Sequence, residues 1–474
     1  MPPSPPHPPS MPGPPNGPAT SPPSFREPRP EPLTRKLGLA GVWFLVINGM
    51  IGAGIFGTPA AAQRLAGDFS PWVFVLCGLL ITPIMLCFVQ LSASVAGTGG
   101  PVLYTRTAFG PFAGFQIGWA FYIARLTAFA ANLNLLVTSL AFFWPQTQGP
   151  ITRFGLMLAC CAAMAWLNIT GARGAVRTLG VITLLKLLPL VVVAIIGLTR
   201  VDAAAFTAIA DPPGRTDLTA AVLIVIYAYV GFESGLVPAG ESRNPQRDMP
   251  RALILALLVC TGLYVLIQLA AQRLVPELAS SQRPLVDAGA ALLGRTGAAI
   301  VVAAIVLSIG GNLLGSMFST SRISYRLALD AQLPSVFARL HPRHETPWFS
   351  VLFYALAALA LAASGSFVYL AVLSVFTRLL IYLTCIAAMH RVRAATPDKD
   401  DRPRLPGGPA IPLLAVGVCT ILLLSVRIDS VLATAAMLAV GSILYLIAAR
   451  SPRKPPAKPE TAPDPGNHRP PQPE

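Results

Sequence analysis

One stretch decides the fold: NGMIGAGIFGTP, at residues 48–59. It lies in the middle of an apolar run, residues 37–65, that is long enough to cross a bilayer with some tilt. Its glycines and Pro59 are unsuited to a continuous helix, so the sequence predicts a broken one. Inside hydrocarbon, unpaired N–H and C=O groups are tolerated only where other protein or a water-filled cavity receives them. The break therefore marks a candidate site.

A second stretch, VGFESGLVP at residues 230–238, is interrupted in a similar way. It repeats the order of an apolar residue, a glycine, and a proline seven positions after that glycine. Two interrupted apolar segments at corresponding places in two halves of a chain are typical of the substrate site of a secondary transporter. The competing interpretation is that the glycines only allow close packing of helices in the membrane.

The composition is that of a polytopic membrane protein. Of 474 residues, 54% are hydrophobic and only 12% are charged, whereas roughly a quarter of a soluble domain is charged. The net charge of +15 lies in short loops and tails between apolar spans, so the membrane explains it better than nucleic acid does. The seven cysteines also fall inside apolar spans and are expected to be small buried hydrophobes. We expect no metal, no cofactor and no nucleic-acid partner.

Apolar stretches separated by turn signals predict an all-α protein with about 12 transmembrane helices. Residues 34–450 form the membrane domain, and the Pro-rich tails at 1–33 and 451–474 are expected to be disordered. The expected spans are 38–65, 71–97, 109–144, 151–169, 175–199, 218–240, 250–273, 287–325, 347–364, 367–390, 409–427 and 430–449. Between the eighth and ninth spans, residues 326–347 mix apolar and polar residues and predict an amphipathic helix along the membrane surface.

The distribution of Lys and Arg predicts the orientation. With an even number of spans both tails share a side, and the segments on that side hold 24 basic residues against eight on the other. Because basic residues are enriched in cytoplasmic loops, both termini are expected in the cytoplasm of a cell with this protein in its inner membrane.

Three basic residues are not part of either side's count and lie within the expected spans, namely Arg125, Lys186 and Arg378, and Glu233 is their main acidic counterpart. Such residues are rare at membrane depth and usually face a cavity, a partner or a transport path. For Arg125 three interpretations stay open: an ion pair with Glu233, extension toward an aqueous vestibule, or binding of an acidic group of the substrate. No nucleophile, base and orienting group recur at motif spacing, so an enzyme is not expected.

Several motifs together resemble the amino acid permeases of the amino acid-polyamine-organocation superfamily. They are RKLG at residues 35–38, IGAGIF at 51–56, GFES at 231–234, and ESRNP at 241–245 followed by MPRA at 249–252. The resemblance covers residues 34–450. It implies a leucine-transporter-like fold, in which spans one to five and six to ten form inverted repeats and spans one and six are broken around the substrate.

The resemblance also implies a binding site. In such permeases the first break holds the substrate α-carboxylate, which here assigns Gly52, Ala53 and Gly54 with neighbouring Ile51 and Ile55. We expect Gly54 to remain small, because the substrate approaches its backbone. The α-amino group is received by carbonyls of the second break, which correspond to Ala228, Tyr229 and Gly231.

Three further positions take expected roles from the resemblance. Tyr227 matches an aromatic gate in the bacterial arginine/agmatine antiporter, and Glu233 matches its pH-sensing glutamate; an ion pair that ties the broken span to its neighbours is the alternative for Glu233. Lys186 matches the span-five lysine of sodium-independent relatives. Arg125 departs from the usual uncharged residue, which leaves a plain neutral amino acid in doubt as the substrate.

We expect the ammonium of Lys186 to take the place of a sodium ion, and the alternative is that this side chain extends to the membrane interface. The oxygen atoms around this ammonium would come from the carbonyls of residues 48–51 and from hydroxyls of span eight, namely Ser316, Ser319 or Thr320. The predicted function is secondary active transport of amino acids or related small organic ions, independent of sodium, with proton coupling or exchange left open. The alternatives are a polyamine or organic cation antiporter, and a transporter-fold sensor or subunit of a partner. The sequence does not determine the substrate or the oligomeric state.

Overall fold

The computed structural model describes residues 38–94, 100–170, 179–199, 214–236, 242, 245–395 and 408–450. The two Pro-rich tails lie outside the described residues, so their predicted disorder stays a prediction. The first half of the chain contains α1 (Leu39–Met50), α2 (Gly54–Ala66), η1 (Gly67–Phe69), α3 (Ser70–Ser94), α4 (Pro101–Phe109), α5 (Pro111–Leu140), η2 (Pro145–Gln148), α6 (Pro150–Thr170) and α7 (Leu179–Leu198). The second half contains α9 (Arg215–Ile226), η3 (Phe232–Gly235), α10 (Pro245–Leu274), η5 (Leu278–Ser280), α11 (Pro284–Leu329), η6 (Ser335–Ala338), α12 (Trp348–Ser364), α13 (Phe367–Ala395), α14 (Ala410–Leu424) and α15 (Ile428–Arg450).

The described part of the chain is helical, as predicted, and its helices are apolar. Seven helical segments are long and apolar enough to cross a membrane, and five shorter apolar helices accompany them. Each predicted span overlaps one apolar helix of the described chain or, for the first span, the pair α1 and α2. The number of membrane crossings and the inverted repeat remain predictions.

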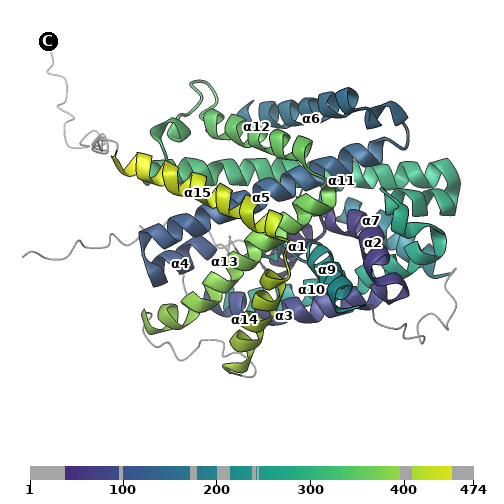
Figure 1. Ribbon diagram of the computed structural model, residues 1–474, viewed down its shortest axis with the longest axis horizontal. Coiled ribbons are helices and arrows are strands. Elements are labelled where there is room, and N and C mark those ends of the chain that lie inside the picture. The colour runs from purple at the N-terminus through teal and green to yellow at the C-terminus, as the bar shows by residue number, and fades with distance from the viewer. Residues whose placement is uncertain are drawn as a thin grey trace, which may run out of the picture. The chain divides into compact units, whose positions relative to one another are not determined.

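The helices differ in how much of their surface the rest of the protein covers. In α5, 89% of the most apolar window is buried inside the molecule, whereas in α15 only 11% is. Figure 1 shows α5 among α11, α12, α13 and α15, all of which contact it. Since an apolar helix that the protein leaves uncovered needs an apolar solvent, α15 lies where lipid can cover it.

One predicted element is wrong, and one was missed. Residues 326–347 do not form an amphipathic helix: α11 continues to Leu329, and turns with the short helix η6 follow. Pro334 and Pro342 explain this, because proline lacks an N–H and disfavours helix in the residue before it. The missed element is α4, which begins with Pro101 and ends before Gly110, at φ +89°.

Candidate substrate site

The first helix break occupies residues 51–53, between α1, which ends at Met50, and α2, which starts at Gly54. The N–H groups of a helix's first turn have no partner within the helix and need one outside it. No described residue accepts a hydrogen bond from the backbone amides of residues 53–55. The break therefore presents free donors at the positive end of a helix dipole, which favours a carboxylate.

The second break occupies residues 227–231, between α9 and η3. It begins before the stretch 230–238 from which it was predicted. Gly231 has φ +106°, a conformation that residues with a side chain rarely adopt. Its N–H donates to a carboxylate oxygen of Glu233 at 2.9 Å, so a nearby side chain completes the turn.

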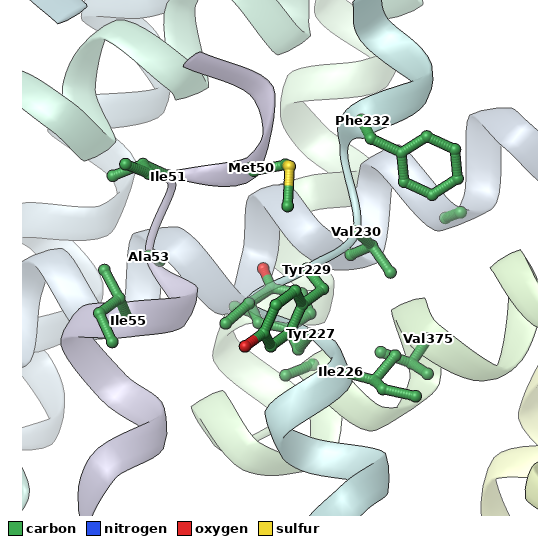
Figure 2. Close-up of a cluster of buried hydrophobic side chains, with 14 of the residues drawn as sticks. Met50, Ile51, Ala53, Ile55, Ile226, Tyr227, Tyr229, Val230, Phe232 and Val375 are labelled. Carbon is green, nitrogen blue, oxygen red and sulfur yellow. The ribbon is translucent and has the colours of Figure 1, made fainter. Parts of the chain in front are cut away.

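The two breaks lie directly against each other, and Figure 2 shows their irregular segments side by side. A Cβ atom on Gly54 would lie 2.5 Å from Cα of Ala228, and one on Gly231 would overlap the carbonyl group of Gly49. Backbones approach this closely only where a side chain is absent. The contact gives Gly54 a second reason to remain small, beside the expected approach of the substrate.

Lys186 of α7 is fully buried, and its ammonium group reaches the first break. Its Nζ donates to the carbonyl oxygen of Ile51 at 2.6 Å, to Oδ1 of Asn48 at 2.7 Å and to the carbonyl oxygen of Asn48 at 3.0 Å. The expected contact with oxygens of residues 48–51 is therefore present. Its role in coupling remains a prediction.

The hydroxyl groups of α11 that were expected around the same ammonium have other partners. Ser316 shares a hydrogen bond with Tyr354 at 3.1 Å, and Ser319 donates to the carbonyl oxygen of Gly315 at 2.9 Å. The expectation is therefore wrong for these two serines. Ser316 is buried and faces Tyr354 of α12, whereas Ser319 is exposed and its hydroxyl bonds back to the preceding turn of α11.

Tyr264 of α10 is fully buried and joins the two breaks. Its hydroxyl lies 3.2 Å from the carbonyl oxygen of Met50 and 3.1 Å from that of Ala228. A hydroxyl has one proton, so it donates to one carbonyl at a time while remaining within reach of both. A single side chain thus ties the end of α1 to the second break.

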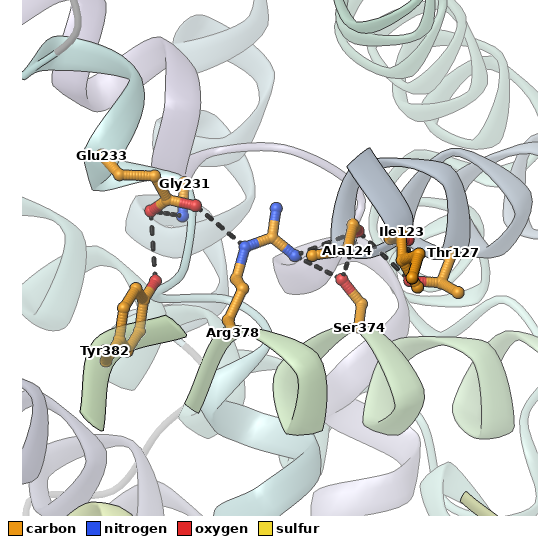
Figure 3. Close-up of polar contacts among 8 residues, drawn as sticks. All are labelled: Ile123, Ala124, Thr127, Gly231, Glu233, Ser374, Arg378 and Tyr382. Carbon is orange, nitrogen blue, oxygen red and sulfur yellow. Dashed lines mark hydrogen bonds and ion pairs between the residues drawn. The ribbon is translucent and has the colours of Figure 1, made fainter. Parts of the chain in front are cut away.

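Glu233 and Arg378 form a buried ion pair between the second break and α13 (Figure 3). Nε of Arg378 lies 2.9 Å from Oε1 of Glu233, and the other carboxylate oxygen accepts a hydrogen bond from Tyr382 at 3.2 Å. The guanidinium group also donates to the hydroxyl of Ser374 and to the carbonyl oxygen of Ala124. A buried ion pair needs such additional hydrogen bonds to offset its desolvation. The ion-pair alternative for Glu233 is present, with Arg378 as the partner.

Arg125 lies on α5, one residue after the carbonyl group that Arg378 binds. Its guanidinium carbon is 5.1 Å from the ring centroid of Phe121, within the range of a cation–π contact. Its own carbonyl oxygen accepts a hydrogen bond from Tyr354 at 3.1 Å. Any role of this arginine in substrate choice remains a prediction.

Tyr227 begins a chain of side-chain hydrogen bonds that returns to the first break. Its hydroxyl donates to Oδ1 of Asn132 at 2.7 Å, and Nδ2 of Asn132 donates to Oδ1 of Asn312 at 3.1 Å. Nδ2 of Asn312 lies 3.8 Å from where a Cβ atom on Gly52 would be. No described residue accepts a hydrogen bond from this nitrogen, so it is a terminal donor beside the break.

The other predicted site residues lie at the breaks but do not all face the same way. Ile51, Ala53 and Ile55 are buried in the hydrophobic cluster drawn in Figure 2. The hydroxyl of Tyr229 donates to the carbonyl oxygen of Phe74 on α3 at 2.7 Å. The side chain of Tyr229 therefore anchors the break, and only its backbone is left for a ligand.

Residues 37–449 match the model of the amino acid permease family. The chain belongs to this family. Similar proteins of Bacillus subtilis include the serine/threonine exchanger SteT, 28% identical over 81% of this chain and 89% of the relative, and the methylthioribose transporter, 26% identical over 88% and 94%. The branched-chain amino acid permease BcaP is 24% identical over 89% of this chain and 94% of its own length. These relatives are transporters, not enzymes.

Three polar residues around the two breaks were not singled out from the sequence, and of a fourth, Asn48, only the backbone carbonyl was. Asn48, Asn132 and Asn312 are carboxamides inside apolar runs, and this was a usable signal because polar groups at membrane depth need partners. Tyr264 gave no such signal, since tyrosine is common in apolar helices. Its place depends on how α10 packs against both breaks.

Proposed function

We propose that this permease is a secondary active transporter that moves amino acids across the cytoplasmic membrane by alternating access. Its twelve spans would include two inverted repeats of five, with both termini in the cytoplasm. The observation that carries the proposal is the contact between the two breaks. One break offers free amide donors, and the other offers carbonyl groups.

An amino acid zwitterion matches this pair of groups. Its carboxylate suits the amides of residues 53–55, since no described residue accepts from them. Its ammonium group suits the carbonyl oxygens of Tyr229 and Val230, for which the described residues supply no donor. Because both sets are backbone groups, they recognise the part that all amino acids share.

Asn132, Asn312 and Tyr227 would then meet the substrate side chain. Nδ2 of Asn312, the terminal donor of this hydrogen-bonded chain, would be left without an acceptor beside an aliphatic side chain, which costs about 1–3 kcal/mol. We therefore propose that the preferred substrates are neutral amino acids whose side chains accept a hydrogen bond. Two relatives are named for different substrates, one as a serine/threonine exchanger and one as a branched-chain amino acid permease. The polar side chains of Asn132, Asn312 and Tyr227 favour substrates like those of the first.

Transport would be independent of sodium, because the ammonium of Lys186 already supplies a positive charge to the oxygens of Asn48 and Ile51. In proteoliposomes, uptake should be unchanged when choline replaces sodium. A large loss of uptake in choline would contradict the built-in cation. Imposed proton gradients and preloaded amino acids then distinguish proton-linked uptake from exchange.

Uptake by proteoliposomes tests the proposed function itself. L-serine and L-threonine should be taken up and should compete better than L-leucine or L-valine. Uptake of agmatine or other amines in preference to amino acids would favour the organic cation antiporter. Thermal stabilisation by an amino acid without any uptake would favour a sensor, because a ligand stabilises the protein that binds it whether or not it crosses the membrane.

The orientation can be tested with two cysteines at exposed positions. Arg247, at the start of α10, belongs to the proposed cytoplasmic side, and Arg427, before α15, to the opposite side. In intact cells, an impermeant thiol reagent should label Arg427→Cys and spare Arg247→Cys. The reverse result would invert the topology.

A further inference from the structure

A polar cavity lies away from the two breaks, where α4, α5, α11 and α15 meet. Its volume is about 270 Å³, and its lining includes Arg106, Asp330, Gln332 and Tyr445 beside small apolar residues. The C-terminal end of α15 and the short helix α4 lie on one side of the view in Figure 1. None of these residues belongs to the proposed amino acid site.

Two sharp turns, at Gly110 and Ala331, and one close helix contact, at Gly114, adjoin the lining of this cavity. Gly110, at φ +89°, lets the chain reverse from α4 into α5, and Gly114 lies against Arg106, whose Cβ would be 2.7 Å from a Cβ on the glycine. On the opposite side, Ala331 has φ +56° and turns the chain sharply after α11. A non-glycine residue in this conformation is uncommon. The backbone is thus shaped on both sides of the space.

The charges at the cavity are complementary to a group that carries both signs. Among the described residues, the guanidinium group of Arg106 has no ion-pair or hydrogen-bond partner. Asp330 follows the last residue of α11, where the helix dipole disfavours a negative charge. Oδ1 of Asp330 lies 3.6 Å from Nε of Arg326. The side chain of Arg326 is 71% exposed, so this ion pair is largely in contact with solvent. The guanidinium group of Arg106 is therefore available to bind an anion. A bound cation would stabilise the carboxylate of Asp330.

The surroundings of the cavity are apolar and face the outside of the protein. Phe112, Leu446 and Ile447 adjoin lining residues in sequence and are 50%, 55% and 50% exposed. Three of the four helices that meet here are long and apolar enough to cross a membrane. Polar groups at the end of such helices, next to exposed apolar side chains, lie where lipid headgroups meet acyl chains.

We propose that this cavity binds the headgroup of a phospholipid that carries a primary amine, such as phosphatidylethanolamine. Arg106 binds the phosphate, with Tyr445 and Gln332 as further donors, because guanidinium groups bind phosphate oxygens through two parallel hydrogen bonds. Asp330 binds the ammonium group. The acyl chains lie along the exposed side chains of α15.

Competition among lipids tests this proposal. Detergent-purified protein is equilibrated with equal amounts of phosphatidylethanolamine, phosphatidylcholine and phosphatidylglycerol, and retained lipid is counted by native mass spectrometry. Wild type should retain phosphatidylethanolamine about tenfold over the other two, since one charge-assisted hydrogen bond has an effect of this order. Equal retention of all three lipids would overturn the proposal.

Variants test the roles of the two charged residues one at a time. Arg106→Gln should lower retention of both phosphatidylethanolamine and phosphatidylglycerol, and Arg106→Lys should restore part of the lost retention. Asp330→Asn should remove the preference for phosphatidylethanolamine and leave phosphatidylglycerol unchanged. The control is Arg427→Gln, at an exposed ion pair with Asp429 that is not part of the cavity. Unchanged retention in Arg106→Gln, or an equal loss in the control, would refute the site.

A soluble phosphate ester could use the same groups, and a further arm distinguishes it from the lipid. Glycerophosphoethanolamine has the headgroup but no acyl chains, so at equal concentration it should not displace the bound lipid. Complete displacement would show that the cavity recognises a soluble compound instead. Neither result depends on whether the permease transports amino acids, because binding is measured without a gradient.

Discussion

Two buried charges next to the helix breaks are held in different ways. The ammonium of Lys186 binds three neutral oxygens of Asn48 and Ile51. The carboxylate of Glu233 binds the charged group of Arg378 at 2.9 Å, together with Tyr382. The first arrangement has a charge without a described counter-ion in direct contact, and the second has a complete ion pair.

This difference bears on what each site can do during transport. If the amine of Lys186 loses its proton, no carboxylate among the described residues is left unpaired at hydrogen-bond distance, because its described partners are neutral oxygens. If either Glu233 or Arg378 loses its charge, the partner remains buried and uncompensated. We therefore interpret Lys186 as the group suited to coupling and the ion pair as the tie that holds the second break to α13.

The largest effect is expected from breaking the ion pair. Glu233→Gln or Arg378→Met alone should destabilise the folded protein by about 3–5 kcal/mol, because an unpaired charge then remains buried. The double variant should be more stable than either single one, since neither charge is left. Thermal unfolding of the detergent-solubilised protein measures this. Additive losses in the double variant would show that the two charges are not coupled.

A smaller loss of stability, with a larger loss of transport, is expected from Lys186→Met. The variant leaves neutral oxygens without a donor, which costs about 1–3 kcal/mol, and it removes a cation that has no counter-ion in contact among the described residues. Uptake should nevertheless fall to background, since the charge at the first break is gone. Uptake at the wild-type rate would leave Lys186 with no role in coupling and would remove the contrast with the ion pair.

The sequence was sufficient for the helical class, the first break and the charged residues within the spans, of which Lys186, Glu233 and Arg378 are buried. Glycine and proline reveal a break through their backbone properties, and a charge in an apolar run is conspicuous without any knowledge of its neighbours. The partners of those charges could not be derived in the same way. Arg378 is 145 positions from Glu233 along the chain, and the pairing depends on how α13 packs against the second break.

The same limit explains the errors at α11. Ser316 and Ser319 were predicted near Lys186 from their place in the eighth span, and the resemblance supported this choice. The helical face on which each hydroxyl lies depends on the rotation of α11 about its axis, which small residues such as Gly315 and Ser316 leave loosely specified in the sequence. Tyr264 and Asn312 lie beside the breaks only because of how distant helices pack together. Their positions could therefore not be predicted from the sequence either.

Two glycines of the first break form a matched pair that separates packing from binding. In Gly54→Ala the new Cβ would meet Cα of Ala228 at 2.5 Å, so we expect a loss of about 1–3 kcal/mol from overpacking. In Gly52→Ala the nearest atom is Nδ2 of Asn312 at 3.8 Å, so stability should be close to wild type. Thermal unfolding measures both losses.

The functional readout of this pair tests where the substrate lies. If the substrate approaches the first break at Gly52, Gly52→Ala should raise the apparent KM for L-serine although the protein is as stable as wild type. An unchanged KM in Gly52→Ala would move the substrate away from this break. A stable Gly54→Ala variant would show that the two breaks separate more easily than their contact implies.

The smallest effect is expected from Tyr264→Phe, which keeps the ring and removes the hydroxyl shared by the two breaks. One hydrogen bond of this kind contributes about 0.5–1.5 kcal/mol, well below the loss of a buried charge partner. Because the hydroxyl lies within reach of Met50 on one break and Ala228 on the other, its loss should let the breaks separate more easily. We expect a small decrease in thermal stability and a clear change in the exchange rate of bound amino acid.

Tyr229→Phe is the control, since its hydroxyl binds α3 and does not join the breaks. If both variants change exchange equally, the hydroxyl bridge between the breaks has no special role, and the backbone contacts at Gly54 and Gly231 are left as the links between them.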